Sequence, residues 1–335
     1  MSGSDVPYHL RPNKFVERQI FIEILERIDK WKDLDKYLYI SMGGRYLEDL
    51  KLIHTRFGIN NLFSIEQDPI TLQRQLFNKP IGLIKCRQLS SAELIKEFDN
   101  LLSEFNADNC IVWLDYADAS KRQTQLREFE TLITKLKAND VVKITLNASL
   151  KTLADENEFD STEEFQKHAL EKIKNKLGDY FPNSYIDHKQ MTSSGLADLL
   201  SQSVKKAALN GLRGSPDLKF YPLAQLKYND AFHSMFTLTA IILKEEDSDD
   251  FNRRTNIKSY DFHTPSWHDI YEISVPDLSL KEKFAIDEIL FSVTDDIMHE
   301  RLPFRFNKDN SKSLDILKNY IKHYKRYPNF VRAFI

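Results

Sequence analysis

The residues best suited to chemistry in this 335-residue chain lie in three short segments, each of which follows an apolar run. These segments are Ser41-Met42-Gly43-Gly44, Glu66-Gln67 and Asp115-Tyr116. Adjacent glycines let a ligand approach the backbone closely, and a helix that begins after them offers unpaired N–H groups. The Glu66 carboxylate can accept hydrogen bonds from two ribose hydroxyl groups, and Asp115 would lie beside the group at the centre of the cleft. The three segments therefore predict a nucleoside-binding site.

The spacing of these segments supports one shared site. Gly43 and Glu66 are 23 positions apart, which leaves room for one helix and one strand. This is close to the roughly 20 residues typical of a nucleoside-binding strand–helix–strand unit. Glu66 and Asp115 are 49 positions apart, which leaves room for two further helix–strand steps. Ligands of open parallel sheets bind beyond the carboxyl ends of the strands, so we expect all three segments at one edge.

Apolar patterning predicts the elements that would position these segments. Five short apolar runs predict strands, and the residues between them have the apolar spacing of helices. The expected strands cover residues 37–41, 62–65, 81–86, 110–114 and 141–146, and the expected helices cover 14–31, 46–57, 70–77, 92–105 and 120–136. Alternation of strands and helices predicts an α/β fold in which helices cover a parallel sheet.

Beyond Asn147 the pattern changes. Helical spacing returns in residues 161–177 and 194–209, and again in 280–291 and 313–324. Between these pairs of helices, Phe220–Leu226 and Phe232–Leu243 have strand-like composition and are separated by only a few residues. Two strands that close together in sequence predict a hairpin, and hence an antiparallel addition to the sheet.

The order of these features resembles the class I S-adenosylmethionine-dependent methyltransferases over roughly Lys14 to Leu243. In that family a glycine loop follows the first strand, an acidic residue ends the second, and a short acidic or aromatic motif ends the fourth. The resemblance implies a Rossmann-like sheet that ends in an antiparallel hairpin, and S-adenosyl-L-methionine as the cofactor. It implies cofactor contacts from Ser41, Met42, Gly43, Gly44, Glu66, Gln67 and Asp115. The chain departs from the family before the glycine loop, where Ser41-Met42 replaces the usual acidic residue.

This comparison suggests five parts of the chain. An N-terminal arm and helix would cover residues 1–35, and the Rossmann-like cofactor-binding core would cover 36–150. A helical insertion would follow at 151–215 and a closing antiparallel hairpin at 216–245. The rest, 246–335, would be a C-terminal extension that is largely helical.

Two residues are candidates for catalysis. Asp115 would orient the nucleophile or the amino end of the cofactor, and Tyr116 would shape the passage of the methyl group. Each site residue also has a plain structural explanation. Asp115 would cap the next helix, Glu66 would begin a turn, and Gly43-Gly44 would form a tight turn.

Composition excludes several other classes of protein. The 47 basic and 50 acidic residues give a formal charge of −3, so the chain is not basic overall. The chain contains no run of 18 apolar residues, and Met1–Leu10 lacks the pattern of a secretion signal. Its two cysteines lie far apart. We therefore expect a cytoplasmic protein without a metal site or a membrane segment. A P-loop, a nucleophile elbow and the full G-x-G-x-x-G spacing of nicotinamide dehydrogenases are also lacking.

The leading function is methyl transfer from S-adenosylmethionine to an unidentified oxygen or nitrogen acceptor. The alternative is a catalytically silent methyltransferase-like module that binds a partner through the insertion or the C-terminal extension. A nucleic-acid contact through the basic tail from Ser311 is possible but not favoured over a plain terminal helix with inward aromatic residues. The arm Tyr8–Lys14 would be a solvated segment, or a lid that folds over the cofactor cleft.

Overall fold

The computed structural model describes residues 10–185, 187–230, 233–292 and 294–329 and contains a sheet of eight strands in the order β3-β2-β1-β4-β5-β7-β6-β8. Only β7 runs antiparallel to its neighbours, β5 and β6. The strand bounds are β1 Leu38–Ser41, β2 Asn61–Glu66, β3 Ile84–Gln88, β4 Cys110–Asp115, β5 Val141–Asn147, β6 Leu218–Asp230, β7 His233–Lys244 and β8 Tyr271–Ile273. The predicted parallel sheet and the closing hairpin are confirmed; Phe232, the first residue predicted for the second hairpin strand, lies outside the described residues.

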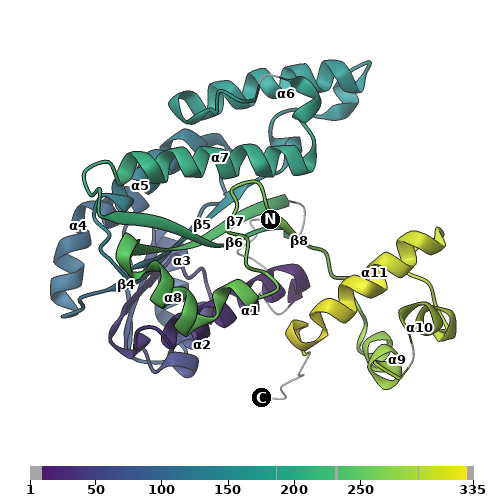
Figure 1. Ribbon diagram of the computed structural model, residues 1–335, viewed down its shortest axis with the longest axis horizontal. Coiled ribbons are helices and arrows are strands. Elements are labelled where there is room, and N and C mark those ends of the chain that lie inside the picture. Colours follow the sequence, from purple (N-terminus) through teal and green to yellow (C-terminus); the bar gives the residue numbers. More distant parts are fainter. Residues whose placement is uncertain (1–9, 186, 231–232, 293, 330–335) are drawn as a thin grey trace.

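The sheet is covered by helices on both faces (Figure 1). Their bounds are α1 Pro12–Asp29, α2 Glu48–Phe57, α3 Pro69–Asn78, α4 Ser91–Glu104, α5 Arg122–Ile133, α6 Thr162–Leu177, α7 Ser193–Gly211, α8 Ser248–Thr255, α9 Leu280–Ile289, α10 Asp295–Arg301 and α11 Asn310–His323. Helices α4, α5 and α7 enclose one apolar core against the sheet, and α1, α2 and α8 enclose a second core on the opposite face. The result is a three-layer α/β arrangement.

Local sequence explains why these elements begin and end where they do. Ser90 and Glu93 form a capping box, in which each side chain accepts a hydrogen bond from the other residue's backbone N–H, and this fixes the start of α4. In α3, the Asp68 side chain accepts a hydrogen bond from Thr71 N and Pro69 occupies the first turn. Strand β4 is buried from Cys110 to Leu114, as expected of a strand covered on both faces.

The segment predicted as a helical insertion contributes to the main core. Helix α7 packs between α5 and the hairpin, and its apolar side chains share one core with β5 and β7. Helix α6 lies beyond α7 (Figure 1) and contributes Ala169, Ile173 and Leu177 to the same core. The helices of residues 151–215 thus extend the covering layer on this face of the sheet.

The C-terminal extension adds three elements that the sequence pattern does not predict: α8, β8 and α10. Strand β8 pairs in parallel with β6, and α9 to α11 project from the side of the molecule (Figure 1). In α11 and the residues after it, Tyr320 and Tyr327 are buried while Lys312, Lys318, Lys322 and Lys325 are exposed. This arrangement agrees with a plain terminal helix; Phe330 and Arg332 of the basic tail lie outside the described residues.

His323 anchors this extension to the rest of the fold. It is fully buried, stacks on Phe262 and lies with Nε2 3.1 Å from the Tyr271 hydroxyl oxygen. Burial, with the nearby charges of Arg326 and Lys322, lowers the pKa of His323 from 6.5 to about 4. The imidazole is therefore neutral in the folded protein at pH values where it is charged in the unfolded chain.

We expect the free energy of unfolding to fall as the pH drops from about 6.5 to about 4, because only the unfolded chain gains a proton on His323. The loss attributable to this residue is about 2–3 kcal/mol by pH 4.5. Urea unfolding of the wild type and of His323→Gln at pH 7 and pH 4.5 measures it. The variant should lose less stability between the two pH values, whereas His168→Gln, at an exposed position, should behave as the wild type. Equal losses in the wild type and His323→Gln would contradict the assignment.

Among the described residues, no helix is both long and apolar enough to cross a membrane.

Candidate functional site

Adjacent parallel strands bring the first and third predicted segments together. Strands β1 and β4 are neighbours in the sheet, with Ser41 paired to Trp113, so their carboxyl ends meet at one edge. A small cavity of about 10 Å³ lies there, lined by Arg18, Ser41, Met42, Gly43, Asp49, Trp113 and Asp115. Four of these residues, Ser41, Met42, Gly43 and Asp115, are predicted cofactor contacts. A volume of this size holds about one water molecule.

The glycine loop packs closely against its own chain. A Cβ atom on Gly43 would lie 2.6 Å from Leu47 Cδ2 and 2.8 Å from Leu50 Cδ1, so a larger residue would have to displace these two buried side chains. Gly44 has a φ of +56°, in the left-handed region that favours glycine. Both glycines therefore meet a structural requirement of the turn, whatever they also contribute to ligand binding.

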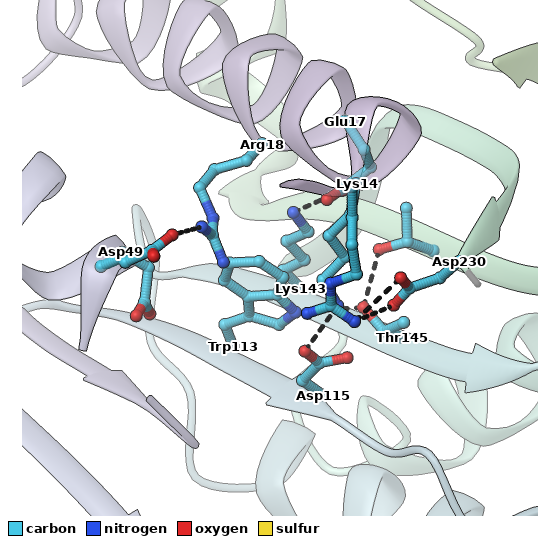
Figure 2. Close-up of polar contacts among 12 residues, drawn as sticks. Lys14, Glu17, Arg18, Asp49, Trp113, Asp115, Lys143, Thr145 and Asp230 are labelled. Carbon is cyan, nitrogen blue, oxygen red and sulfur yellow. Dashed lines mark hydrogen bonds and ion pairs between the residues drawn. The ribbon is translucent and has the colours of Figure 1, made fainter. Parts of the chain in front are cut away.

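The first two turns of α1 close over this edge of the sheet (Figure 2). Arg11 directly precedes the helix. Lys14 Nζ lies 2.8 Å from Asp115 Oδ2, and Arg11 Nη1 lies 2.8 Å from both carboxylate oxygens of Asp230 at the end of β6. Arg18 Nη1 lies 3.5 Å from Glu48 Oε2 at the start of α2. We call Arg11, Lys14 and Arg18 the α1 clamp. Its three cations link α1 to three separate elements around the cavity.

The clamp determines the charge state of Asp115. Burial alone would raise the pKa of this carboxyl group, but the Lys14 ammonium, with weaker help from Lys143 and Arg18, holds the pKa below its usual value. Lys14 is itself 3% exposed, so both charges of the pair are largely withdrawn from water. Asp115 is thus an ionised carboxylate that already binds an ammonium group.

A second ion pair lies beneath the clamp, between Glu17 of α1 and Lys143 of β5. Lys143 Nζ lies 2.5 Å from Glu17 Oε1, and both side chains are fully buried. The ammonium also lies 3.7 Å from the centre of the Trp113 ring, a cation–π contact. Burial lowers the pKa of Lys143 to about 8, although Glu17 opposes the shift. This pair joins α1 to the middle of the sheet, directly behind the Trp113 wall of the cavity.

The second predicted segment lies one strand away from the cavity. Glu66 ends β2, and its Oε1 accepts a hydrogen bond from Asp68 N at 2.9 Å, as expected of a residue that begins a turn. Its other oxygen, Oε2, has no hydrogen-bond partner within the ranges that the structure describes. Gln67 is exposed, and its carbonyl oxygen lies 3.4 Å from Gln88 Nε2. Glu66 therefore combines a structural role with one carboxylate oxygen that a ligand can reach.

Tyr116 is placed apart from the other candidates. Its hydroxyl group donates to Glu128 Oε2 at 2.7 Å, which directs the ring toward α5 on the opposite face of the sheet from α1. Burial and the Glu128 carboxylate raise the pKa of Tyr116 well above its usual value, so it stays a neutral donor. Tyr116 does not line the cavity.

Sequence reasoning missed three residues of the cavity wall: Arg18, Asp49 and Trp113. A signal for Arg18 exists in the sequence. Lys14, Arg18, Phe21 and Leu25 recur at intervals of three or four residues, so the two cations fall on the apolar, buried stripe of α1. Cations on such a stripe indicate a polar target beneath the helix, which here consists of carboxylates at strand and helix ends.

The strand order β3-β2-β1-β4-β5-β7-β6, with β7 antiparallel, and the glycine loop and carboxylates at its carboxyl edge define a class I methyltransferase fold. Residues 6–335 match the family described as "Putative O-methyltransferase", and the chain belongs to this family. No curated protein matches the sequence.

Several solved structures of methyltransferases are similar to this chain at low identity. One is a 16S rRNA (adenine(1408)-N(1))-methyltransferase from Catenulisporales acidiphilia, with 11% identity, a TM-score of 0.35, and coverage of 67% of this chain and 93% of that one. A second is described as a putative sarcosine dimethylglycine methyltransferase from Galdieria sulphuraria, with 12% identity, a TM-score of 0.32, and coverage of 68% and 86%. A third is the plantazolicin methyltransferase BpumL, with 14% identity, a TM-score of 0.31, and coverage of 68% and 85%.

The residues at this edge fit the two ends of S-adenosylmethionine unequally. The nucleoside end is matched by the free carboxylate oxygen of Glu66, at the end of the strand that follows the glycine loop. The methionine end is not matched in the observed arrangement. The cavity beside Asp115 has room for about one water molecule, and Lys14 already occupies the carboxylate that an amino group would use.

Proposed function

We propose that this protein binds S-adenosylmethionine at the carboxyl edge of its sheet and transfers the methyl group to an oxygen or nitrogen atom of an acceptor. The observation that carries the proposal is the placement of the glycine loop between two carboxylates. In the sheet order β2-β1-β4, Glu66 ends β2, Ser41 to Gly44 follow β1, and Asp115 ends β4. Membership of the O-methyltransferase family supports the same reaction, and an oxygen acceptor is the first to test.

The α1 clamp must open before the methionine end of the cofactor can enter. Lys14 and an incoming ammonium group would compete for Asp115, and the 10 Å³ cavity has to widen. Opening requires Lys14 to leave Asp115, and Arg11 and Arg18 hold the same end of α1 to Asp230 and Glu48. The protein's own residues therefore control access to the site, and the closed arrangement is a resting state.

One observation favours a second candidate function, a methyltransferase-like module that no longer transfers methyl groups. Lys14 satisfies Asp115 internally, and Ser41-Met42 stands where related enzymes have a carboxylate before the glycine loop. In such a module the clamp would be permanent, and the fold would serve to bind a partner.

Calorimetric titration with S-adenosylmethionine and S-adenosylhomocysteine, with NAD as the control, tests the proposal. We expect binding of the first two ligands in the micromolar range and no binding of NAD. Absence of binding to both sulfur ligands would reject the proposed function and leave the silent module as the explanation of the fold.

Replacing Glu66 with alanine should weaken S-adenosylhomocysteine binding by about 1–3 kcal/mol, because a ribose hydroxyl would lose a charged hydrogen-bond acceptor. The measurement is the same titration at constant pH and ionic strength. Glu171→Ala, at an exposed position on α6, is the matched control and should leave the affinity unchanged. An unaltered affinity in Glu66→Ala would remove this residue from the site.

A further inference from the structure

In α3 a polar side chain is buried and large apolar side chains are exposed, the reverse of an ordinary surface helix. Gln75 is its one buried residue, and Gln75 Oε1 lies 3.4 Å from the Ser64 hydroxyl oxygen in the sheet. By contrast, Phe77 is 91% exposed and Leu76 is 47% exposed. Ten large apolar side chains are strongly exposed in the described part of the chain, and four of them, Ile70, Leu76, Phe77 and Leu83, lie on α3 or just after it. Such clustering marks an interaction surface more often than scattered exposed residues do.

These apolar side chains border an open edge of the sheet. Strand β3 is the last strand on its side of the described sheet, so its outward backbone groups are free to pair. Asn78 Nδ2 donates to the Arg45 carbonyl oxygen in the loop after β1, which turns that flank of α3 inward. Leu76 precedes Asn78 by two positions, about 200° around the helix, and so lies on the flank toward β3. Phe77 follows the buried Gln75 by two positions, again about 200°, and so faces away from the sheet. Leu83 directly precedes the strand.

The opposite face of the same edge is cationic. Side chains alternate along β3, so Ile84 and Cys86 face the core beneath α3 while Lys85 and Arg87 face α4. There Lys85 Nζ and Arg87 Nη2 lie 3.2 Å and 2.6 Å from carboxylate oxygens of Glu104, two cations on one carboxylate. Residues 69–92 include Arg74, Lys79, Lys85 and Arg87 but no Asp or Glu. A strand added to β3 would thus meet apolar side chains on one face and positive charge on the other.

We propose that this β3-edge surface, formed by Leu76, Leu83, Lys85 and Arg87, binds an extended segment of a partner protein in which apolar and acidic residues alternate. The segment would pair with the β3 backbone, place its apolar side chains against α3 and its carboxylates near Lys85 and Arg87. This inference does not depend on methyl transfer, because the surface lies outside the cavity.

Two other occupants fit the surface less well. A second copy that paired β3 with β3 in the antiparallel sense would set the Lys85 and Arg87 side chains of the two strands against each other, and like charges opposite one another destabilise a strand pair. Single-stranded nucleic acid binds to aromatic stacking platforms, whereas the apolar side chains of this surface, Leu76 and Leu83, are aliphatic. A strand in which acidic and apolar side chains alternate can contact the apolar face and the cationic face of this edge together.

The test uses fluorescein-labelled synthetic peptides of about nine residues, the length of a typical strand with flanks. One peptide alternates isoleucine and glutamate. A second has the same composition in two blocks, and a third has lysine in place of glutamate. Fluorescence anisotropy with the full-length protein should show the alternating acidic peptide binding about tenfold more tightly than either comparison peptide. Hydrogen exchange should show new protection of the β3 amides when that peptide is bound.

Variants locate the binding to this surface. Leu76→Ser should weaken binding of the acidic peptide about tenfold, and Arg87→Glu should reverse the preference toward the lysine peptide. Leu209→Ser, at an exposed apolar position on α7, is the matched control and should have no effect. Leu76 is 47% exposed, so we expect the serine variant to fold, and circular dichroism checks this.

Three outcomes would overturn the proposal. The first is equal or absent binding of the three peptides. The second is binding of an oligouridylate that Leu76→Ser abolishes, which would assign the surface to nucleic acid. The third is a dimer in light scattering that Leu76→Ser converts to a monomer, which would assign it to a second copy. Loss of cofactor binding would leave the peptide result unchanged, so this inference and the proposed function fail separately.

Discussion

Replacing Glu17 with alanine should lower the free energy of unfolding by about 3–5 kcal/mol, because it leaves the Lys143 ammonium unpaired in the core. Both side chains of this pair are fully buried, and Lys143 Nζ lies 2.5 Å from Glu17 Oε1. Guanidinium unfolding monitored by circular dichroism measures the loss. This is the largest effect that we expect from any single substitution in the protein.

The surroundings of Lys143 explain why the loss should be large. The ammonium lies over Trp113 and Phe21, with 3.7 Å and 4.2 Å between Nζ and the two ring centres. Those rings supply cation–π attraction but no hydrogen-bond acceptor for the N–H groups. Burial already lowers the pKa of Lys143 to about 8 while Glu17 opposes the shift. Without Glu17 the pKa must fall further, so at pH 7 the folded protein would hold either an unpaired charge or a neutral lysine.

A double variant separates the pair's net contribution from the cost of an unpaired charge. Glu17→Leu combined with Lys143→Met fills the same space with apolar groups, and its stability should lie within about 1 kcal/mol of the wild type or above it. The exposed pair Lys167–Glu163 is the matched control, and Glu163→Ala there should cost less than about 1 kcal/mol. A double variant as unstable as Glu17→Ala alone would contradict the explanation and indicate a packing defect.

The alternating strands and helices of the core could be predicted because local apolar patterning determines them. Each predicted strand from β1 to β5 is present, since parallel strands covered on both faces need continuous apolar runs. The third strand is shifted, with residues 81–86 predicted and Ile84–Gln88 observed. Its register is fixed by pairing with β2, in which Leu62 is paired with Ile84, and single-sequence patterning contains no such information.

Elements that depend on distant partners could not be predicted. Strand β8 has only three residues and exists because Leu226 to Tyr228 of β6 offer it a partner. Helix α8 is strongly polar, and its buried Phe251 packs edge-on against Trp31, which follows α1 and is far away in sequence. Local composition indicates neither contact.

In the candidate site, too, some contacts follow from local sequence and others depend on distant packing. Ser41 and Asp115 meet because they end neighbouring strands, which the alternation pattern implies. The separation of Asp115 from Tyr116 also follows from a local rule, because successive side chains of a strand point to opposite faces. The clamp is different: Lys14 lies 101 positions from Asp115, and only the packing of α1 on the sheet brings them together.

Replacing Lys14 with methionine should strengthen S-adenosylhomocysteine binding about tenfold, close to 1.4 kcal/mol. In the wild type, the ligand's ammonium group must displace Lys14 from Asp115, and a site that is open only a tenth of the time shows a tenfold weaker apparent affinity. Lys14 Nζ lies 5.7 Å and 5.9 Å from the ring centres of Trp113 and Tyr228. Methionine keeps most of the apolar stem of the buried Lys14, so the walls of the site should remain packed.

The same substitution changes the titration of Asp115. Lys14 is the strongest influence that lowers the pKa of this carboxyl group, so in Lys14→Met burial should dominate and the pKa should rise. The binding measurement is therefore made at both pH 7 and pH 8, because a higher pH favours the ionised carboxylate. Lys30→Ala, at an exposed position just after α1, is the matched control for loss of a positive charge and should leave the affinity unchanged.

The direction of the change distinguishes the two candidate functions. Tighter binding in Lys14→Met, abolished by adding Asp115→Asn, means that Lys14 is an internal competitor for a working cofactor site. Weaker binding means that the Lys14 cation is part of the site, and the closed clamp is then the binding-competent form. No binding in either protein means that the clamp has become a permanent structural contact, because removing its ammonium group from Asp115 frees no site for the ligand.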